Sequence, residues 1–221
     1  MLKLMLSAEL AERVFSQGHT SIALIGAEQL WVKQQTDAFM ERFEELGGEV
    51  VVLLEPLPDA ANVYTDALKI AEAQDDITAI VSTTDGIHVG ARVAKQMRTL
   101  GVELPMYSIT IDADTIAAAD GSYEGMEFLS FLTPTDEFAQ RYEARFGIAP
   151  DIGAASAYDA VMLIAEAMEA TGSTEPAVLA QHLNSIEVFD GASGRLTSDG
   201  MGGFTKPSAL FLVEDGAAMQ I

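Results

Sequence analysis

Short apolar segments of strand length alternate with amphipathic helical segments along the first 132 residues, and this alternation constrains the fold more than any other feature. Between the apolar runs, hydrophobic residues recur every three or four positions, as they do on one face of a helix. Several of these periodic segments end at glycine, which is favoured just after a helix. The pattern predicts βαβ units built on a parallel sheet, with strands at 20–26, 49–54, 78–84, 106–110 and 126–132 and helices at 6–14, 32–46, 65–74, 89–100 and 114–119.

The alternation of strand and helix segments ends after residue 132. A Thr-Pro-Thr-Asp segment breaks the chain and supplies a helix N-cap, and helices are predicted at 138–146, 157–170 and 175–186. The second of these is apolar nearly all round, so we expect it to be buried on more than one side. The glycine-rich tail predicts turns, a hairpin and a last strand at 209–214.

Composition excludes several classes of protein. The 221 residues suffice for one large domain or two compact lobes, and 49% are hydrophobic, which excludes a disordered chain. Twelve basic residues against 34 acidic ones give a net charge of −22, so we expect no nucleic-acid partner. The chain has no cysteine, and its longest apolar runs are far shorter than a membrane span. Because Glu9 and Glu12 come too early for a secretory core, we expect no signal peptide in this chain.

Four stretches, taken in order, carry a family resemblance: AFMERFEELGGEVV, YTDALKIAEAQDDITAIV, SYEGMEF, and AYDAVMLIAEAMEATG followed by FDGASGRLTSDGMGGF. In this respect the chain resembles the periplasmic solute-binding proteins of the type that binds leucine, isoleucine and valine. The similarity extends over nearly the whole chain. It implies the type I periplasmic binding fold: an α/β, doubly wound, parallel-sheet lobe of the flavodoxin-like kind, with the C-terminal portion of a second α/β lobe.

The resemblance also implies an organisation and a role. Residues 1–132 would form the family's second lobe, 133–204 a remnant of its first lobe, and 205–221 a return to the second lobe. The N-terminal part of the first lobe has no counterpart here, so a homodimer through the surface that it would cover is a further expectation. By resemblance the chain binds a branched-chain or other amino acid for an ABC transporter, faces a permease, lies in the periplasm or outside the cell, and is no enzyme.

In parallel sheets ligands bind beyond the carboxyl ends of the strands, so the loops after the strands supply the candidate residues. Trp31 falls where the family places a cleft aromatic, although a sole tryptophan can equally be a surface anchor. In the loop 82–86, Thr83, Thr84 and Asp85 can hold the polar end of a ligand, or simply cap the next helix.

Two further candidates depend on the resemblance. Glu124 matches a family glutamate that reaches the ligand's ammonium group, against the alternative of a solvated loop carboxylate. Tyr158 heads a helix where the family has a tyrosine near the cleft, although packing at the helix start is the simpler reading.

Catalysis and metal binding have little support in the sequence. The three histidines, His19, His88 and His182, are scattered without metal-binding spacing, and no nucleophile motif or phosphate-binding loop occurs. We therefore expect no catalytic residue, no metal and no cofactor. Two alternatives stay open at this point: a cytoplasmic flavodoxin-like enzyme or regulatory domain, and an incomplete fragment without a complete site.

Overall fold

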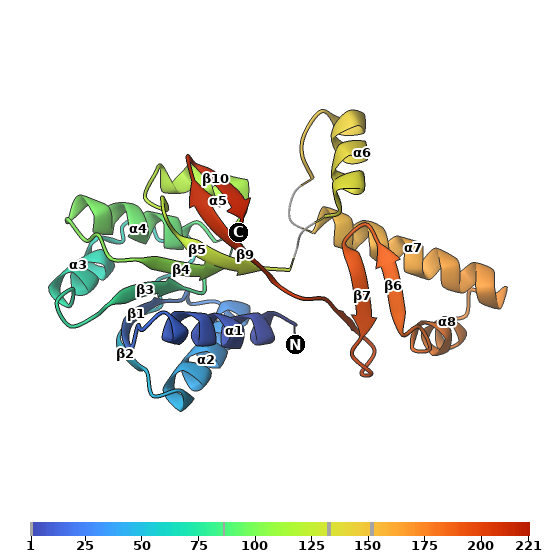
Figure 1. The fold of residues 1–221 in the computed structure, drawn as a ribbon, viewed down its shortest axis with the longest axis horizontal. Coiled ribbons are helices and arrows are strands. Elements are labelled where there is room, and N and C mark those ends of the chain that lie inside the picture. The colour runs from blue at the N-terminus through green and yellow to red at the C-terminus, as the bar shows by residue number, and fades with distance from the viewer. Residues whose placement is uncertain (1, 86, 132–133, 151–152) are drawn as a thin grey trace. The chain divides into compact units, whose positions relative to one another are not determined.

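The computed structural model describes residues 2–85, 87–131, 134–150 and 153–221, and the chain divides into two compact units (Figure 1). Unit 1 comprises Met1–Ser130 and Ser208–Ile221, and unit 2 comprises Phe131–Pro207.

Unit 1 is built on a seven-stranded sheet of order β10-β9-β5-β4-β3-β1-β2. The five strands from β1 to β5 run parallel, as predicted, because a crossover helix joins each strand to the next one in the chain. The last two strands pair antiparallel, and β10 was not predicted because its four residues are all exposed. The strands are β1 (Ser21–Ile25), β2 (Glu49–Leu54), β3 (Ala79–Ser82), β4 (Met106–Ile109), β5 (Glu127–Ser130), β9 (Ala209–Glu214) and β10 (Ala217–Gln220).

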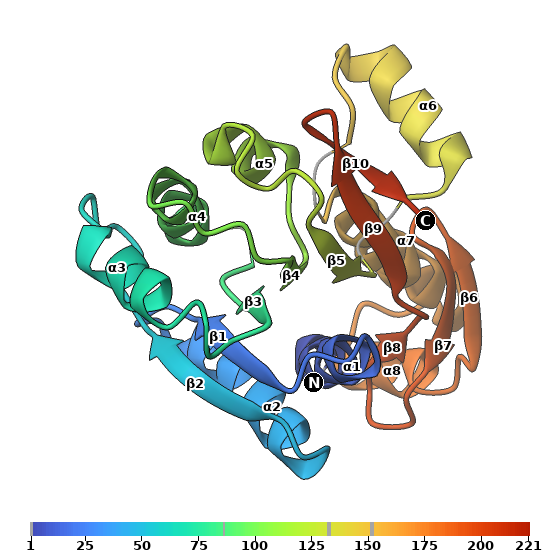
Figure 2. The same cartoon turned by 60° about the vertical axis from the view of Figure 1, so that its left-hand side comes forward.

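Helices cover both faces of this sheet, as expected for a doubly wound fold (Figure 2). Helices α1 and α2 pack together on one face, and α3, α4 and α5 form a row on the other. Their bounds are α1 (Leu2–Ser16), α2 (Leu30–Glu45), α3 (Tyr64–Glu72), α4 (Val89–Thr99) and α5 (Ala113–Ala119). The predicted α/β fold class is therefore confirmed. The predicted end of the fifth strand at residue 132 lies outside the described residues.

The core of unit 1 lies between the sheet and its helices. Strands β3 and β4 are buried at every position, so their side chains contribute to the core on both faces of the sheet. On the α2 side, the rings of Phe39 and Phe43 stack with centroids 5.4 Å apart. Full burial of one such side chain contributes about 1.5–3 kcal/mol, so this core holds the ends of the strands in fixed positions.

Unit 2 combines three helices with a three-stranded antiparallel sheet of order β6-β7-β8. Its elements are α6 (Asp136–Phe146), α7 (Ala154–Thr171), α8 (Pro176–Leu183), β6 (Val188–Gly191), β7 (Gly194–Ser198) and β8 (Phe204–Thr205). Thr135 caps α6, as the sequence predicted, since its hydroxyl accepts a hydrogen bond from Phe138 N at 3.3 Å.

The prediction that α7 is buried on more than one side was wrong. Its buried residues, Ala155, Asp159, Leu163 and Ala167, are spaced by four and form a single stripe. Val161 is 65% exposed and Ile164 45% exposed on the remaining surface of the helix. The apolar composition of a helix does not determine how many elements pack around it. The other elements of unit 2 cover only one stripe of α7.

Candidate functional site

The polar residues that directly follow β3 are buried at the carboxyl edge of the sheet in unit 1. Thr83 is fully buried, and its Oγ1 lies 2.7 Å from Thr36 Oγ1 on α2. Its backbone N–H donates to the carbonyl of Ile25, at the end of β1, over 2.9 Å. Thr84 Oγ1 lies 2.9 Å from Ser82 Oγ. These hydrogen bonds tie Thr83 to α2 and to the end of β1.

Helix α4 approaches this loop closely because of Gly90. A Cβ atom at this position would lie 2.4 Å from Thr84 Oγ1 and 3.2 Å from the hydroxyl of Tyr123. Tyr123 is buried, and burial raises the pKa of its phenol, so the hydroxyl keeps its proton and can donate a hydrogen bond. The close approach brings the start of α4, with its partial positive charge, to the same edge.

Two adjacent strands end in residues with left-handed backbone. Asp85, three residues after the end of β3, has φ +54°, and Thr110, directly after β4, has φ +37°. Such geometry costs on the order of 1–3 kcal/mol in a residue other than glycine, and it is a clear outlier for a β-branched side chain. Strained residues of this kind cluster at ligand sites. Thr110 was missed by sequence reasoning because nothing in the sequence reports its φ.

Trp31 belongs to the same edge, in the first turn of α2 after β1. It is half-buried and packs against the hydrophobic core, while its carbonyl accepts a long hydrogen bond of 3.4 Å from Gln35 Nε2. The structure therefore brings four predicted residues, Trp31, Thr83, Thr84 and Asp85, to one edge of one sheet. Gly86, in the same loop, lies outside the described residues.

The structure does not bring Glu124 to this edge. Glu124 precedes β5, so it lies at the amino end of the parallel strands, opposite Thr83 and Asp85. There it is exposed, and its Oε1 accepts a hydrogen bond of 3.0 Å from Asp215 N in the turn between β9 and β10. The expected role in binding an ammonium group is corrected to a contact that holds this turn.

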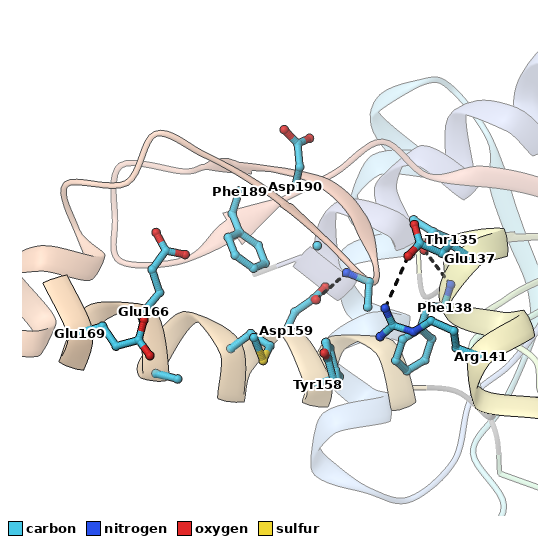
Figure 3. A pocket seen from close by; sticks show the side chains of 14 residues that line it. Thr135, Glu137, Phe138, Arg141, Tyr158, Asp159, Glu166, Glu169, Phe189 and Asp190 are labelled. Carbon is cyan, nitrogen blue, oxygen red and sulfur yellow. Dashed lines mark hydrogen bonds and ion pairs between the residues drawn. The ribbon is translucent and has the colours of Figure 1, made fainter. Parts of the chain in front are cut away.

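Tyr158 belongs to unit 2, where it lines a groove of about 510 Å³ between α6, α7 and β6 (Figure 3). Tyr158 is 41% exposed, and the centroid of its ring lies 5.4 Å from that of Phe138. Phe189 of β6 points toward α7 in this groove, and Glu166 and Glu169 of α7 line it as well.

The neighbouring Asp159 has a clear structural task. It is 2% exposed, and its carboxylate accepts hydrogen bonds from Ala192 N at 2.6 Å, Ser193 N at 2.7 Å and Ser193 Oγ at 2.5 Å. These three donors lie in the tight turn between β6 and β7. Asp159 thus ties the hairpin to α7.

The described parts of the chain hold no group of three or more histidine, cysteine, aspartate or glutamate side chains placed to bind a metal ion. Within the same residues, none of the helices has the length and apolar character needed to cross a membrane.

Comparison with known proteins defines the class. The family model described as periplasmic binding protein matches residues 4–217. The chain therefore belongs to this family, as the resemblance implied.

Solved structures show the same fold. The leucine-binding protein LivK of Thermotoga maritima is 22% identical with a TM-score of 0.85, over 99% of this chain and 65% of that one. An ABC transporter substrate-binding protein of Desulfitobacterium hafniense in complex with Leu is 22% identical with a TM-score of 0.81, and the match covers 99% of this chain and 65% of that one. A solute-binding protein of Rhodopseudomonas palustris in complex with 3,4-dihydroxybenzoic acid is 18% identical with a TM-score of 0.84, and the match covers 99% of this chain and 64% of that one. The chain thus spans about 65% of the length of these relatives.

Proposed function

We propose that this chain binds a small, amine-bearing solute, a branched-chain or other amino acid, as the substrate-binding component of an ABC transporter. One observation carries the proposal: the hydroxyl groups of Thr83 and Thr84 are buried and held by hydrogen bonds at the carboxyl edge of a parallel sheet, where such folds bind ligands, and Asp85 is buried next to them in the chain. The match to the periplasmic binding protein family supports it.

Charge favours an amine over an aromatic acid as the ligand's polar anchor. Asp85 is 5% exposed and brings a carboxylate to the edge, and a carboxylate binds an ammonium group through a charge-assisted hydrogen bond. A benzoate would place a second negative charge beside it, in a chain whose net charge is already −22. The carboxylate of an amino acid has other partners at this edge, since hydroxyls and the amides at the start of α4 favour an anion.

The proposal extends to the residues around the ligand, to the two units and to the transporter. Trp31 would contact the apolar side chain of the ligand, and Tyr158 would contribute from unit 2. Unit 1 would correspond to the second lobe of the family and unit 2 to a remnant of the first. A permease partner and a place in the periplasm or outside the cell follow from the same proposal.

Isothermal titration calorimetry with each of the twenty standard L-amino acids and with 3,4-dihydroxybenzoate tests the proposal. Asp85→Asn removes the negative charge and keeps a residue that tolerates left-handed backbone. We expect affinity for the bound amino acid to fall at least tenfold, as for the loss of a hydrogen bond to a charged group. The matched control is Asp215→Asn: Asp215 is also left-handed, with φ +52°, but is exposed at the opposite edge. Wild-type binding of 3,4-dihydroxybenzoate alone, or equal binding by Asp85→Asn, would refute the proposal.

A further inference from the structure

Helix α7 carries a second stripe of apolar residues, on the surface away from its buried one. This outer stripe consists of Ala157, Val161, Ile164 and Met168, and all four are exposed. Val161 is 65% exposed, Ile164 45% and Met168 37%. Exposed apolar residues that adjoin one another mark a surface for a partner, whereas scattered ones need no explanation.

The spacing of the outer stripe fits a helix as its partner. The intervals between its members are four, three and four residues, which is the a/d pattern of a coiled-coil seam. In an antiparallel pair of α7 helices, Val161 of each copy would face Ile164 of the other, and Ala157 would face Met168. Each layer then joins a smaller side chain to a larger one, so the two helices stay evenly spaced. A parallel pair would instead place Ala157 against Ala157 and Met168 against Met168.

Charges beside the stripe also favour the antiparallel arrangement. Arg141 of α6 lies near the start of α7, where it lines the groove of unit 2 together with Tyr158 (Figure 3). Glu166 and Glu169 line the same groove toward the other end of α7, and both are exposed. A two-fold axis across the middle of α7 therefore brings Arg141 of one copy to the two glutamates of the other. A parallel pair would keep Arg141 at the end of α7 that is remote from both glutamates.

Arg141 is available for such a contact. Its ion pair with Glu137 spans 3.5 Å between side chains that are 60% and 82% exposed. Exposed pairs of this kind hold a side chain only weakly.

We propose that the outer stripe of α7 is a dimerisation surface, on which a second copy of this chain packs its own α7 in the antiparallel direction. Pairing of identical surfaces about a two-fold axis gives a closed dimer. The homodimer expected from the sequence thereby acquires a definite surface. The inference depends on unit 2 alone and on no bound ligand, so failure of the proposed function would leave it standing.

Sedimentation equilibrium of the full chain measures the dimer. We expect wild type to dimerise and Val161→Glu to be monomeric at the same concentrations, because the new carboxylate would be buried against Ile164 of the other copy. Val178→Glu is the matched control: Val178 is 40% exposed on α8 of the same unit, and its replacement should leave the dimer intact. Both positions are exposed, so neither change should disturb the fold.

Charge reversal tests the contacts beside the stripe. Arg141→Glu should weaken the dimer about tenfold, since two such contacts occur in each symmetric dimer. Glu169→Arg in the same chain should restore the affinity to within about threefold of wild type. A double variant as weak as Arg141→Glu alone would exclude these contacts.

Disulfide formation tests the orientation, on a background free of other thiols because the chain has no cysteine. When Val161→Cys and Ile164→Cys chains are mixed and mildly oxidised, antiparallel pairing predicts disulfides between unlike variants. Disulfides between like variants alone would show a parallel pair. That result, a monomeric wild type, a dimer that persists in Val161→Glu, or an equal loss of the dimer in Val178→Glu would overturn the inference.

Discussion

Replacement of Asp159 by alanine should strongly destabilise unit 2 and leave unit 1 intact. The buried carboxylate accepts hydrogen bonds from two backbone N–H groups and one hydroxyl, at 2.5–2.7 Å, all in the turn between β6 and β7. Alanine would leave these donors buried without a partner. Removal of one partner of a buried charged interaction costs about 3–5 kcal/mol. A unit of this size has roughly 4–12 kcal/mol of stability at 0.05–0.15 kcal/mol per residue, so the loss removes between about a quarter and all of the total.

Hydrogen exchange measured by mass spectrometry reports the two units separately. In Asp159→Ala we expect the amides of β6, β7 and the start of α7 to lose protection, while β1, β3 and β4 keep theirs. Asp190→Ala is the control: Asp190 lies in the same hairpin, but its side chain is 70% exposed and its ion pair with Arg195 spans 3.6 Å. Such an exposed pair contributes less than about 1 kcal/mol. Wild-type protection of the hairpin in Asp159→Ala would refute the reasoning.

Two further predictions concern unit 1. Gly90→Ala should lower ligand affinity and destabilise the chain by about 1–3 kcal/mol, because the added Cβ would lie 2.4 Å from Thr84 Oγ1 and must displace the residues after β3. Calorimetry measures the affinity and urea unfolding measures the stability. Unchanged affinity would contradict the placement of these residues in the binding site. His19 lies 3.1 Å from Tyr107 OH, and burial lowers the pKa of His19 below its ordinary value of 6.5, against a smaller opposing effect of Glu127. The unfolded chain therefore binds a proton more readily than the folded one below pH 6.5, so neutral His19 supports stability above that pH and the support is lost as the pH falls. In urea unfolding, His19→Gln should therefore lose less stability than wild type between pH 7 and pH 5. If wild type and variant differ by the same unfolding free energy at both pH values, the proposed effect of His19 is excluded.

Much of unit 1 could be predicted from the sequence because its signals are local. Strand β2 and the last predicted strand, Ala209–Glu214, occur at their predicted bounds, since a short apolar run between polar residues is visible in the sequence itself. The ends of three helices could also be predicted from the glycines that follow them, because glycine readily adopts the positive φ found just after a helix. Gly18, Gly47 and Gly101 all have positive φ.

The remainder depends on contacts between distant residues or on backbone geometry. Asp159 bonds a turn more than thirty residues away along the chain, and the helical pattern around it carries no trace of that partner. The left-handed backbone of Thr110 follows from how β4 ends against its neighbours. Glu124 was misplaced although its edge was predictable, because a residue that precedes a parallel strand lies opposite the residues that follow one.

Native mass spectrometry of the purified chain, incubated with an equimolar mixture of the twenty amino acids and 3,4-dihydroxybenzoate, tests the central claim most directly. We predict one adduct of amino-acid mass per wild-type chain, lost in Asp85→Asn and retained in Asp215→Asn. A chain that binds nothing, binds the benzoate, or keeps its amino acid after the loss of the Asp85 charge would contradict the proposed site.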